Sequence, residues 1–230
     1  LLALTMVISG MTIPEKKATA AEDTPVANEA TEVNNASVEY VAQIGEQSYA
    51  TFAEALDVAN DSTEAVTIKL LADVELTNSI VINNANNVDI TIDGTNGDAR
   101  YKLAISSVQI DNKGNPSIQL HQKSGEITFQ NMNIEHGGTE MLLRLGENTY
   151  GEGTDRALTV NMTNMDITST STYTWCLMAT QDLGQFDINM TNVNVDWNGD
   201  DATQSSRAFL RCGKGINYAQ TVNLTATGCT

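Results

Sequence analysis

The stretch "NMTNMDI" at positions 161–167 returns 28 residues later as "NMTNVNV" at positions 189–195. The repetition has two interpretations. In the first, Asn161 and Asn189 are glycosylation acceptors of the Asn-x-Thr type, as is Asn223 in "NLT". In the second, the chain passes equivalent points of a repeating structure, and the shared letters are architectural.

A wider alignment favours the architectural interpretation. The segments "ITFQNMNIE", "VNMTNMDIT", "INMTNVNVD" and "VNLTATGCT" align on a central residue, in turn Asn131, Asn164, Asn192 and Ala226. These residues are separated by 33, 28 and 34 positions, and Gly94 takes the same place in a weaker copy, "ITIDGTN". Asn tolerates left-handed backbone angles, and its amide can bond the same Asn in the next turn. We therefore predict a structural ladder of Asn131, Asn164 and Asn192.

A second set of strands lies between these segments. "MLLRLGENTY" at 141–150 and "AFLRCGKGINY" at 208–218 share the pattern L-R-[LC]-G, which places Arg144 and Arg211 two repeats apart. The intermediate repeat supplies "TWCLMAT", which aligns Met178 with Cys212. Each repeat then holds three strands: one before the Asn, one after a tight bend, and one after a longer loop. Stacked repeats of this kind predict an all-β, single-stranded parallel β-helix. An antiparallel β-sandwich is the alternative, but it does not predict in-register repeats.

The folded part is expected to open with a cap. Residues 41–44 read as a short strand, and Thr51 can cap a following helix. Apolar residues then recur at helical spacing and define one face, which comprises Phe52, Ala55, Leu56 and Ala59.

This opening resembles a known family. The pattern Y-A-T-F-x-E-A-L-x-x-A, followed by "VTIKLLADVEL", is similar to the start of right-handed parallel β-helix domains of the pectin-lyase-like type. Such domains occur in secreted and cell-surface proteins of Gram-positive bacteria, often of the gut. The resemblance covers residues 39–230 and implies that the short helix caps one end of the β-helix. It is specific for fold and leaves the activity open, because the family includes polysaccharide lyases, hydrolases and other proteins.

The chain is expected to divide into four segments. An apolar run of 13 residues followed by Ala18-Thr19-Ala20 reads as a partial signal peptide over 1–20. Residues 21–38 are polar and read as a disordered linker. Residues 39–62 form the strand and helix cap, and 63–230 form the β-helix, which we expect to be truncated at its C-terminus. This organisation predicts a secreted or extracellular protein without a membrane span in the mature chain, attached to the cell wall through a missing C-terminal region.

Composition narrows the partners. The chain has 12 basic and 29 acidic residues, a formal net charge of −17, which argues against nucleic acid and anionic lipid as partners. The three cysteines, Cys176, Cys212 and Cys229, lack a CxxC pattern and are expected to be small buried apolar residues. Two histidines are too few for a His-based metal site.

Strand alternation predicts a ligand-binding stripe. If Leu143 and Leu145 and their counterparts point inward, their neighbours point outward. The outward set with the chemistry to stack on sugars and to bind carboxylates comprises Arg144, Tyr173, Trp175, Phe209 and Arg211. The alternative is that the loops at 146–156 and 196–207 fold over these side chains as an apolar cluster.

Catalysis and metal binding have weaker support in the sequence. Two carboxyl pairs, Asp200 with Asp201 and Asp166 with Asp196, are formal candidates for glycoside hydrolysis. However, "HGG" at 136–138 precedes the Asp-Asp pair, and Arg-x-Lys does not follow it, so the motif order of the family's galacturonan hydrolases is not matched. We predict no catalytic residues. The loop "DWNGDD" offers Asp196, Asn198 and Asp200 as oxygen ligands, which makes calcium the one candidate cofactor.

These observations predict a non-catalytic secreted or cell-surface β-helix module, acting as an adhesin or a glycan-facing binding domain. Its expected partners are polysaccharides or glycans of a host or a cell wall. Two alternatives stay open: an N-terminal fragment of a polysaccharide lyase or glycoside hydrolase, and a structural surface stalk.

Overall fold

A computed structural model describes residues 39–105, 117–137, 140–147, 153–171, 176–198, 208–213 and 220–230. The predicted signal peptide and linker lie outside these residues. The described part holds one helix, α1 (Phe52–Asp61), and the following strands: β1 (Ala42–Ile44), β2 (Gln47–Tyr49), β3 (Val66–Leu70), β4 (Val74–Glu75), β5 (Ile80–Ile82), β6 (Ile90–Asp93), β7 (Thr95–Asn96), β8 (Ala99–Arg100), β9 (Lys102–Ile105), β10 (Ile118–Leu120), β11 (Ser124–Gln130), β12 (Asn133–His136), β13 (Leu143–Leu145), β14 (Asp155–Ser169), β15 (Cys176–Thr180), β16 (Leu183–Trp197), β17 (Ala208–Cys212) and β18 (Gln220–Thr227).

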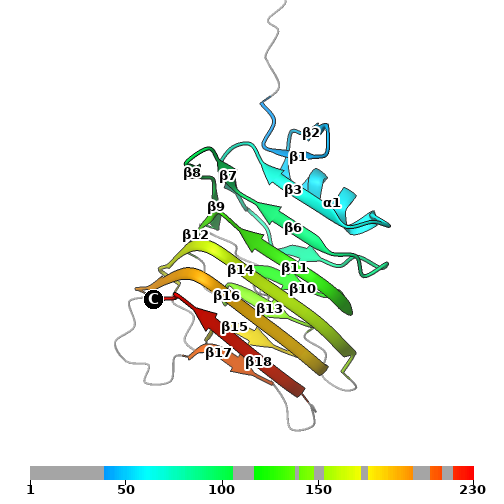
Figure 1. Ribbon diagram of the computed structural model, residues 1–230, viewed down its shortest axis with the longest axis vertical. Helices are drawn as coiled ribbons and strands as arrows, with labels where there is room; N and C mark the ends of the chain where they lie inside the picture. Colours follow the sequence, from blue (N-terminus) through cyan, green and yellow to red (C-terminus); the bar gives the residue numbers. More distant parts are fainter. Residues whose placement is uncertain are drawn as a thin grey trace, which may run out of the picture. The chain divides into compact units, whose positions relative to one another are not determined.

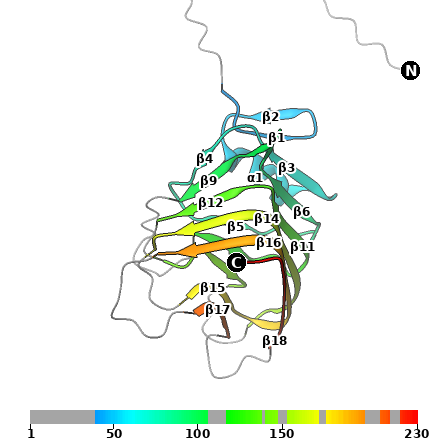
Figure 2. The same cartoon turned by 60° about the vertical axis from the view of Figure 1, so that its left-hand side comes forward.

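The strands stack into a solenoid of about four turns with three walls (Figures 1 and 2). Wall 1 is the strand order β3-β6-β11-β14-β16-β18, and wall 2 is β4-β9-β12-β14-β16. Wall 3 is the separate sheet β5-β10-β13-β15-β17. The long strands β14 and β16 each run through walls 1 and 2. Each turn therefore consists of three strands, as the repeat predicted.

Parallel pairing between turns identifies the architecture as a β-helix. From β11 to β14 and from β14 to β16, residues pair in parallel register over almost the whole strand. The antiparallel sandwich is therefore wrong for this chain. Antiparallel pairs occur among the described residues only in the opening hairpin β1–β2, in β1–β3 and in the small hairpin β7–β8.

The interior is built from stacked rows of apolar side chains. Two rows of inward-pointing side chains on wall 1 are almost completely buried. One row comprises Ile90, Ile127, Val160 and Ile188, and the other comprises Ile92, Phe129, Met162 and Met190. Successive turns pair in parallel register, so each inward residue lies against its counterpart in the next turn. Burial of a large aliphatic or aromatic side chain contributes about 1.5–3 kcal/mol, so this repeated core dominates the stability.

The cap has the predicted helix, and its expected first strand is half of a hairpin, β1–β2. Thr51 accepts a hydrogen bond from the Glu54 N–H through Oγ1 at 3.2 Å, and Glu54 accepts one from the Thr51 N–H at 3.0 Å, which together form a capping box. The four residues of the expected apolar face are all buried. Asn84, also buried, donates from Nδ2 to the Ala59 and Ser62 carbonyls and ties the end of α1 to the first turn.

The bend between walls 1 and 2 is made by asparagine. Asn131, Asn164 and Asn192 have φ of 51°, 52° and 54°, the left-handed region that most side chains avoid. Nδ2 of Asn164 donates to Oδ1 of Asn131 at 3.2 Å, and Nδ2 of Asn192 donates to Oδ1 of Asn164 at 3.1 Å. The three amides thus form a continuous hydrogen-bonded column across the turns.

The column ends on a carboxylate. Asn131 donates to Oδ1 of Asp93 at 3.3 Å, and Gln130 donates to Oδ2 at 3.0 Å. Burial alone would raise the pKa of Asp93, but hydrogen bonds from Thr95, Gln130 and Asn131 outweigh it, so the pKa is lowered. Gly94 takes the corner position in that turn, as the alignment predicted, and a Cβ there would lie 2.6 Å from Cβ of Met132.

Two of the predicted registers are wrong. Ala226 pairs with Met190, so the residue opposite Asn192 is Gly228, with φ of 64°. In wall 3, Met178 pairs with Leu210, two residues from the predicted Cys212. In both cases the prediction rests on similar residue types, whereas the hydrogen-bonded register pairs different residues.

The cysteines only partly match the expectation. Cys176 is buried, Cys229 is half-buried, and Cys212 is exposed, so the expected burial is wrong for Cys212. None of the three forms a disulfide in the described part of the chain.

The corner column generates a first prediction. Asn164→Ala should lower the free energy of unfolding by about 2–3 kcal/mol, because alanine is strained at positive φ and the amide is lost. Asn164→Gly is the matched control, since it keeps the backbone angle and removes only the amide, and we expect it to cost about 1 kcal/mol. Urea denaturation measures both; an alanine variant at least as stable as the glycine variant would contradict a left-handed corner.

Candidate functional site

The structure divides the predicted ligand stripe. Tyr173 and Trp175 lie outside the described residues, and their part of the prediction stays a prediction. Arg144, Phe209 and Arg211 are described, on β13 and β17 of wall 3.

Phe209 was assigned to the wrong face. Leu142 and Leu177, the residues in register with it, are buried in the main core, and Phe209 packs against the same core. Leu142 shares a small internal cavity with Ile118, Phe129 and Leu143. The last three strands of wall 3, β13, β15 and β17, are thus each entered by two consecutive apolar residues that pack in the core. The chain turns a corner there, and strict alternation begins only afterwards.

The outer side of wall 3 is occupied by other residues. Met141, Cys176 and Ala179 form a second buried cluster, with Ala208 packed against it. Arg144 is only 3% exposed; its Nε donates to the Gly146 carbonyl at 3.2 Å, and its Nη2 donates to Oε1 of Gln119. Arg211 is half-buried and lies in the same register row, with Ala179 between the two arginines. Arg144 therefore takes part in internal hydrogen bonds, and the binding role predicted for the stripe stays a prediction.

A buried ion pair lies where wall 3 turns into wall 1. Nε of Arg156 donates to Oδ2 of Asp182 at 2.7 Å, and both side chains are 0% exposed. Arg156 also donates to the carbonyls of His121 and Gln122, and its Nη2 lies 3.2 Å from Oε1 of Glu147. The guanidinium thus joins successive turns at this corner.

The surroundings of Asp182 are fitted to it. Its Oδ2 also accepts the Glu147 backbone N–H at 2.7 Å. Gly146, with φ of 98°, lies so close that a Cβ would be 2.8 Å from Oδ2 of Asp182. These contacts describe a closed structural network that the sequence did not reveal, because Arg156 and Asp182 are 26 residues apart and match no motif.

Asp182→Asn tests this network. Asp182 has φ of 79°, a conformation that asparagine also tolerates, and the substitution keeps the shape of the side chain. It leaves the buried Arg156 without its main counter-charge, so we expect a loss of about 3–5 kcal/mol in the free energy of unfolding. The control is Asp166→Asn, which removes the exposed pair with Arg100 and should cost less than about 1 kcal/mol. Both losses are measured by chemical denaturation. Equal losses in the two variants would contradict a large contribution of the Arg156–Asp182 pair to the free energy of unfolding.

Both histidines are contacted by neighbouring polar side chains. Nδ1 of His136 lies 3.0 Å from Oγ of Ser169, and burial lowers the pKa of His136 from 6.5 to about 4. Nε2 of His121 lies 3.1 Å from Oε1 of Gln119. Burial also lowers the pKa of His121 to about 4; Glu147 opposes this shift, and Arg144 and Arg156 add to it.

These lowered pKa values set a pH dependence. As the pH falls below about 6.5, the unfolded chain binds protons that the folded chain takes up only near pH 4, so the free energy of unfolding falls across this window. For the buried His136 the full loss is about 3 kcal/mol. His136→Met should flatten the pH profile between 6.5 and 4 relative to the parent chain, and carboxylates common to both cancel in the difference. A profile of unchanged slope would show that His136 titrates normally when folded.

The predicted calcium loop is described only in part. Nδ2 of Asn198 donates to Oδ1 of Asp196 at 2.6 Å, so the amide turns its nitrogen toward the carboxylate. Asp200 lies outside the described residues, and the calcium hypothesis stays a prediction. Within the described ranges, no group of three or more His, Cys, Asp or Glu residues is placed to hold a metal ion.

Of the two carboxyl pairs considered for glycoside hydrolysis, Asp166 with Asp196 lies within the described residues, and both side chains make surface contacts. Asp166 pairs with Arg100 at 3.2 Å and accepts a hydrogen bond from Asn194 at 2.7 Å. Asp166, Asn194 and Asp196 border a shallow depression of about 370 Å³ on wall 2, together with Thr230. These contacts give Asp166 a structural role, because they link it to side chains of other strands. Asp200 and Asp201 lie outside the described residues.

A feature that sequence reasoning missed is the outer face of wall 1. Two neighbouring outward rows carry hydroxyl and amide side chains across successive turns. We call them the hydroxyl–amide face, and they comprise Thr67, Thr91, Thr128, Asn161, Asn189 and Thr225 in one row and Gln130, Thr163, Thr191 and Thr227 in the other. The two rows become visible when the repeats are aligned in parallel register, so the repeat alignment already held the information needed to find them.

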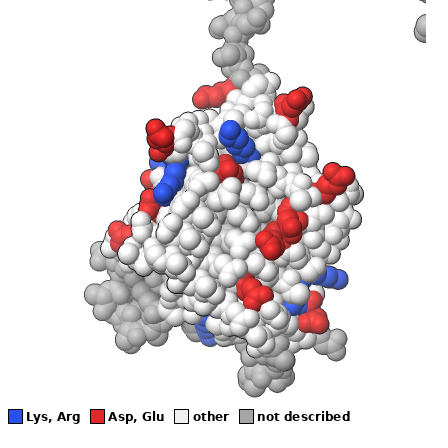
Figure 3. Space-filling model, in the orientation of Figure 1, with Lys and Arg blue, Asp and Glu red and all other residues white. Residues whose placement is uncertain are grey.

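The hydroxyl–amide face is nearly free of charge. Figure 3 shows white, uncharged areas on this side of the molecule with acidic side chains among them, and Glu126 and Asp187 occupy the outward row next to Thr128, Asn161 and Asn189. Charges enter the second row only in the first two turns, at Lys69 and Asp93. Nδ2 of Asn189 donates to Oδ1 of Asn161 at 3.0 Å. Nδ2 of Asn161 donates to Oε2 of Glu126 at 3.1 Å and lies 3.3 Å from Oγ1 of Thr128, so a carboxylate at the margin of the face also orients this amide. Strand geometry repeats these groups about every 4.8 Å across the turns and about 6.6 Å along each strand.

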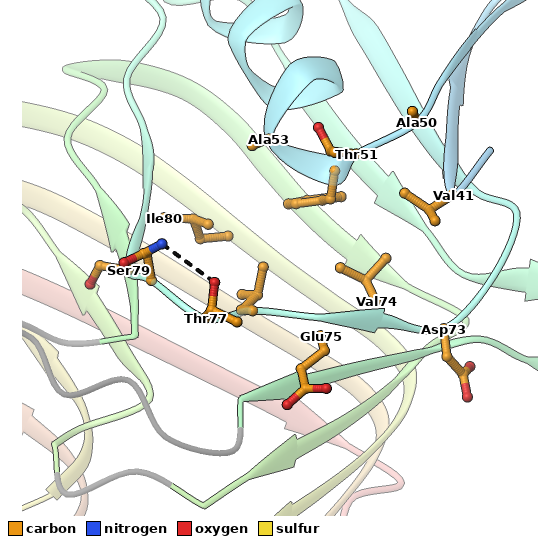
Figure 4. Close-up of a pocket in the computed structure, with 13 residues that line it drawn as sticks. Val41, Ala50, Thr51, Ala53, Asp73, Val74, Glu75, Thr77, Ser79 and Ile80 are labelled. Carbon is orange, nitrogen blue, oxygen red and sulfur yellow. Dashed lines mark hydrogen bonds between the residues drawn. The ribbon is translucent and has the colours of Figure 1, made fainter. Parts of the chain in front are cut away.

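A groove lies at the capped end (Figure 4). It has a volume of about 440 Å³ and runs between the start of α1 and the segment from β4 to β5. Val41, Val74 and Ile80 contribute its apolar part, and Asp73 and Glu75 are among its polar residues. Oδ1 of Asp73 accepts the Lys102 N–H at 2.8 Å, so one of these carboxylates already serves the fold.

Comparison of the chain with protein-family models, with curated proteins and with solved structures gave no match. Among the described residues, no helix has the length and apolar character needed to cross a bilayer.

Proposed function

We propose that this chain is a non-catalytic module of a secreted or cell-surface bacterial protein, and that it binds a neutral polysaccharide through the hydroxyl–amide face of wall 1. The observation that carries the proposal is the near absence of charge from this face in a chain of net charge −17. A surface kept uncharged on so acidic a protein suits a neutral ligand. The resemblance of the opening segment to pectin-lyase-like domains supports the bacterial surface setting.

The chemistry of the face matches the chemistry of sugars. Hydroxyl and carboxamide groups both donate and accept hydrogen bonds, as the hydroxyls of a polysaccharide do. The groups are held on a rigid sheet, so little conformational entropy is lost when a ligand is bound. Each contact is weak, but a polymer can engage several turns at once, and these contacts add through effective concentration.

Binding is tested by co-sedimentation with insoluble cellulose and chitin, preceded by a glycan array. The variant is Thr163→Arg with Thr191→Arg, which places two bulky charges in the middle of the face. We expect at least about a tenfold loss of retained protein, the size of effect that about 1.4 kcal/mol produces. Both residues point outward from wall 1, so neither arginine enters the core, but the two positions are register partners and their charges repel. Retention is therefore measured well below the thermal midpoint of the double variant.

The matched control is Thr168→Arg, an exposed outward residue on wall 2. This variant should bind like the parent chain. Retention that is unchanged in the double variant would refute the proposed face. Absence of binding to any glycan by the parent chain would favour the stalk, and release of shortened oligosaccharides would favour an enzyme.

A further inference from the structure

The neutral part of the hydroxyl–amide face is narrow along the strands and long across them. The strands β11, β14 and β16 lie side by side (Figure 1), and each contributes two neutral outward residues, namely Thr128 and Gln130, Asn161 and Thr163, and Asn189 and Thr191. The two residues of one strand lie about 6.6 Å apart, and neighbouring strands lie about 4.8 Å apart. Both rows continue on β18, so the neutral residues form a strip two residues wide that runs across the turns.

Carboxylates border this strip on one side. The next outward row holds Glu126, Thr159 and Asp187, which are in register on β11, β14 and β16. Nδ2 of Asn161 donates to Oε2 of Glu126 at 3.1 Å, and Nδ2 of Asn223 donates to Oδ1 of Asp187 at 2.7 Å. Taking an ionised carboxylate out of water is costly unless it is paired with a charge. A neutral ligand laid along a strand would cover this row and would lose affinity there.

The asparagine bend limits the strip on its other side. Asn131, Asn164 and Asn192 directly follow the last outward residue of the strip on each strand, and there the backbone turns from wall 1 into wall 2 (Figure 2). Outward residues beyond the bend therefore belong to another wall of the solenoid. A ligand that lies along one strand meets two neutral positions, whereas a ligand that lies across the strands meets two in every turn that it crosses.

The two rows offer different hydrogen-bonding groups. Nδ2 of Asn189 donates to Oδ1 of Asn161 at 3.0 Å. A carboxamide has two N–H donors and two acceptor lone pairs, so each amide has hydrogen-bonding capacity beyond this bond. In the other row, Thr163 and Thr191 carry hydroxyl groups, which both donate and accept. A chain of sugars lying between the rows would have amides along one edge and hydroxyls along the other.

We propose that the ligand is an unbranched β-1,4-linked polysaccharide that lies across the strands between the two rows, with about one sugar residue over each turn. This inference rests on the proposed function and adds the linkage and the direction of the chain. An extended β-1,4-linked chain is a straight ribbon with hydroxyl groups along both edges, and each residue advances by nearly the spacing of neighbouring strands. An α-1,4-linked chain coils and cannot follow straight rows. The face includes no aromatic side chain, so it suits the hydroxyl-bearing edges better than the ring faces.

Linkage and length are tested by calorimetric titration of the full chain with soluble cello-oligosaccharides and chito-oligosaccharides, from disaccharide to hexasaccharide. In at least one of these series we expect the Kd to fall at least about tenfold from disaccharide to tetrasaccharide, because each added residue reaches another turn. Malto-oligosaccharides of equal length are the coiled comparison and should bind at least about tenfold more weakly at the tetrasaccharide. A Kd that does not depend on length, or equal binding of the malto-oligosaccharides, would overturn the proposal.

The direction of the chain is tested with two arginine variants near Asn161. Thr128→Arg lies in the strip, one turn away, whereas Thr159→Arg lies on the same strand as Asn161 but in the row of carboxylates, between Glu126 and Asp187. We expect Thr128→Arg to raise the Kd of the hexasaccharide at least about tenfold and Thr159→Arg to leave it within about twofold. The opposite order would show a chain that runs along the strand.

A thermal scan checks that each variant folds. If Thr128→Arg does not fold, Gln130→Arg takes its place, because Gln130 lies in the other row of the same strand and bonds to Asp93, which would pair with the new charge.

Failure of this inference differs from failure of the proposed function. If Thr163→Arg with Thr191→Arg loses retention on cellulose or chitin but the length or direction test fails, the face binds a glycan and the extended chain across the strands is refuted. If the double variant binds like the parent chain, or the parent chain binds no glycan, the face is refuted and this inference with it.

Discussion

In-register stacking of identical corners is the constraint on which the rest of this structure depends. A parallel β-helix places each residue over its counterpart one turn away, so an error at one corner shifts every side chain that follows to the wrong face. Asn131, Asn164 and Asn192 fix the corner in two ways. They accept the left-handed backbone that the bend requires, and their amides bond from turn to turn in the direction of stacking. Local conformation and long-range register are thus specified by the same three side chains.

The corner also explains which parts of the fold could be predicted from the sequence. An Asn that recurs at the same place in each repeat indicates both a positive φ at that place and the length of the repeat. The turns of the solenoid could therefore be predicted from the sequence. The last corner was misplaced because "NLT" resembles "NMT", although the backbone needs only a residue that tolerates positive φ. Gly228 meets that need without resembling Asn, and Ala226 does not. Backbone conformation is therefore a better guide to register than similarity of letters.

The candidate site was harder to predict because it depends on which side chains face outward. Alternation from Leu143 and Leu145 gave the wrong face for Phe209, since two consecutive residues point inward where the chain enters wall 3. Arg144 is buried, and its hydrogen bonds to Gln119 and Gly146 give it a structural role that a sequence pattern does not reveal. The ion pair of Arg156 with Asp182 was missed for a related reason, because loops of different length bring the two residues together. The hydroxyl–amide face needed only correct register, and it could have been read from the aligned repeats.

Stacking also constrains where an acidic chain can place its charges. Residues in register lie about 4.8 Å apart, and like charges at that distance destabilise a sheet. On wall 2, Asp166 is flanked in its row by Asn133 and Asn194, and Glu135 is separated from Asp196 by Thr168. The neutral residues between carboxylates hydrogen-bond to them, as Asn194 does to Asp166. The abundance of Asn and Thr in this chain is thus partly a condition for stacking so many acidic residues. The same arrangement recurs on wall 1, where Thr159 separates Glu126 from Asp187 in one outward row, and Asn161 of the next row donates to Glu126 at 3.1 Å.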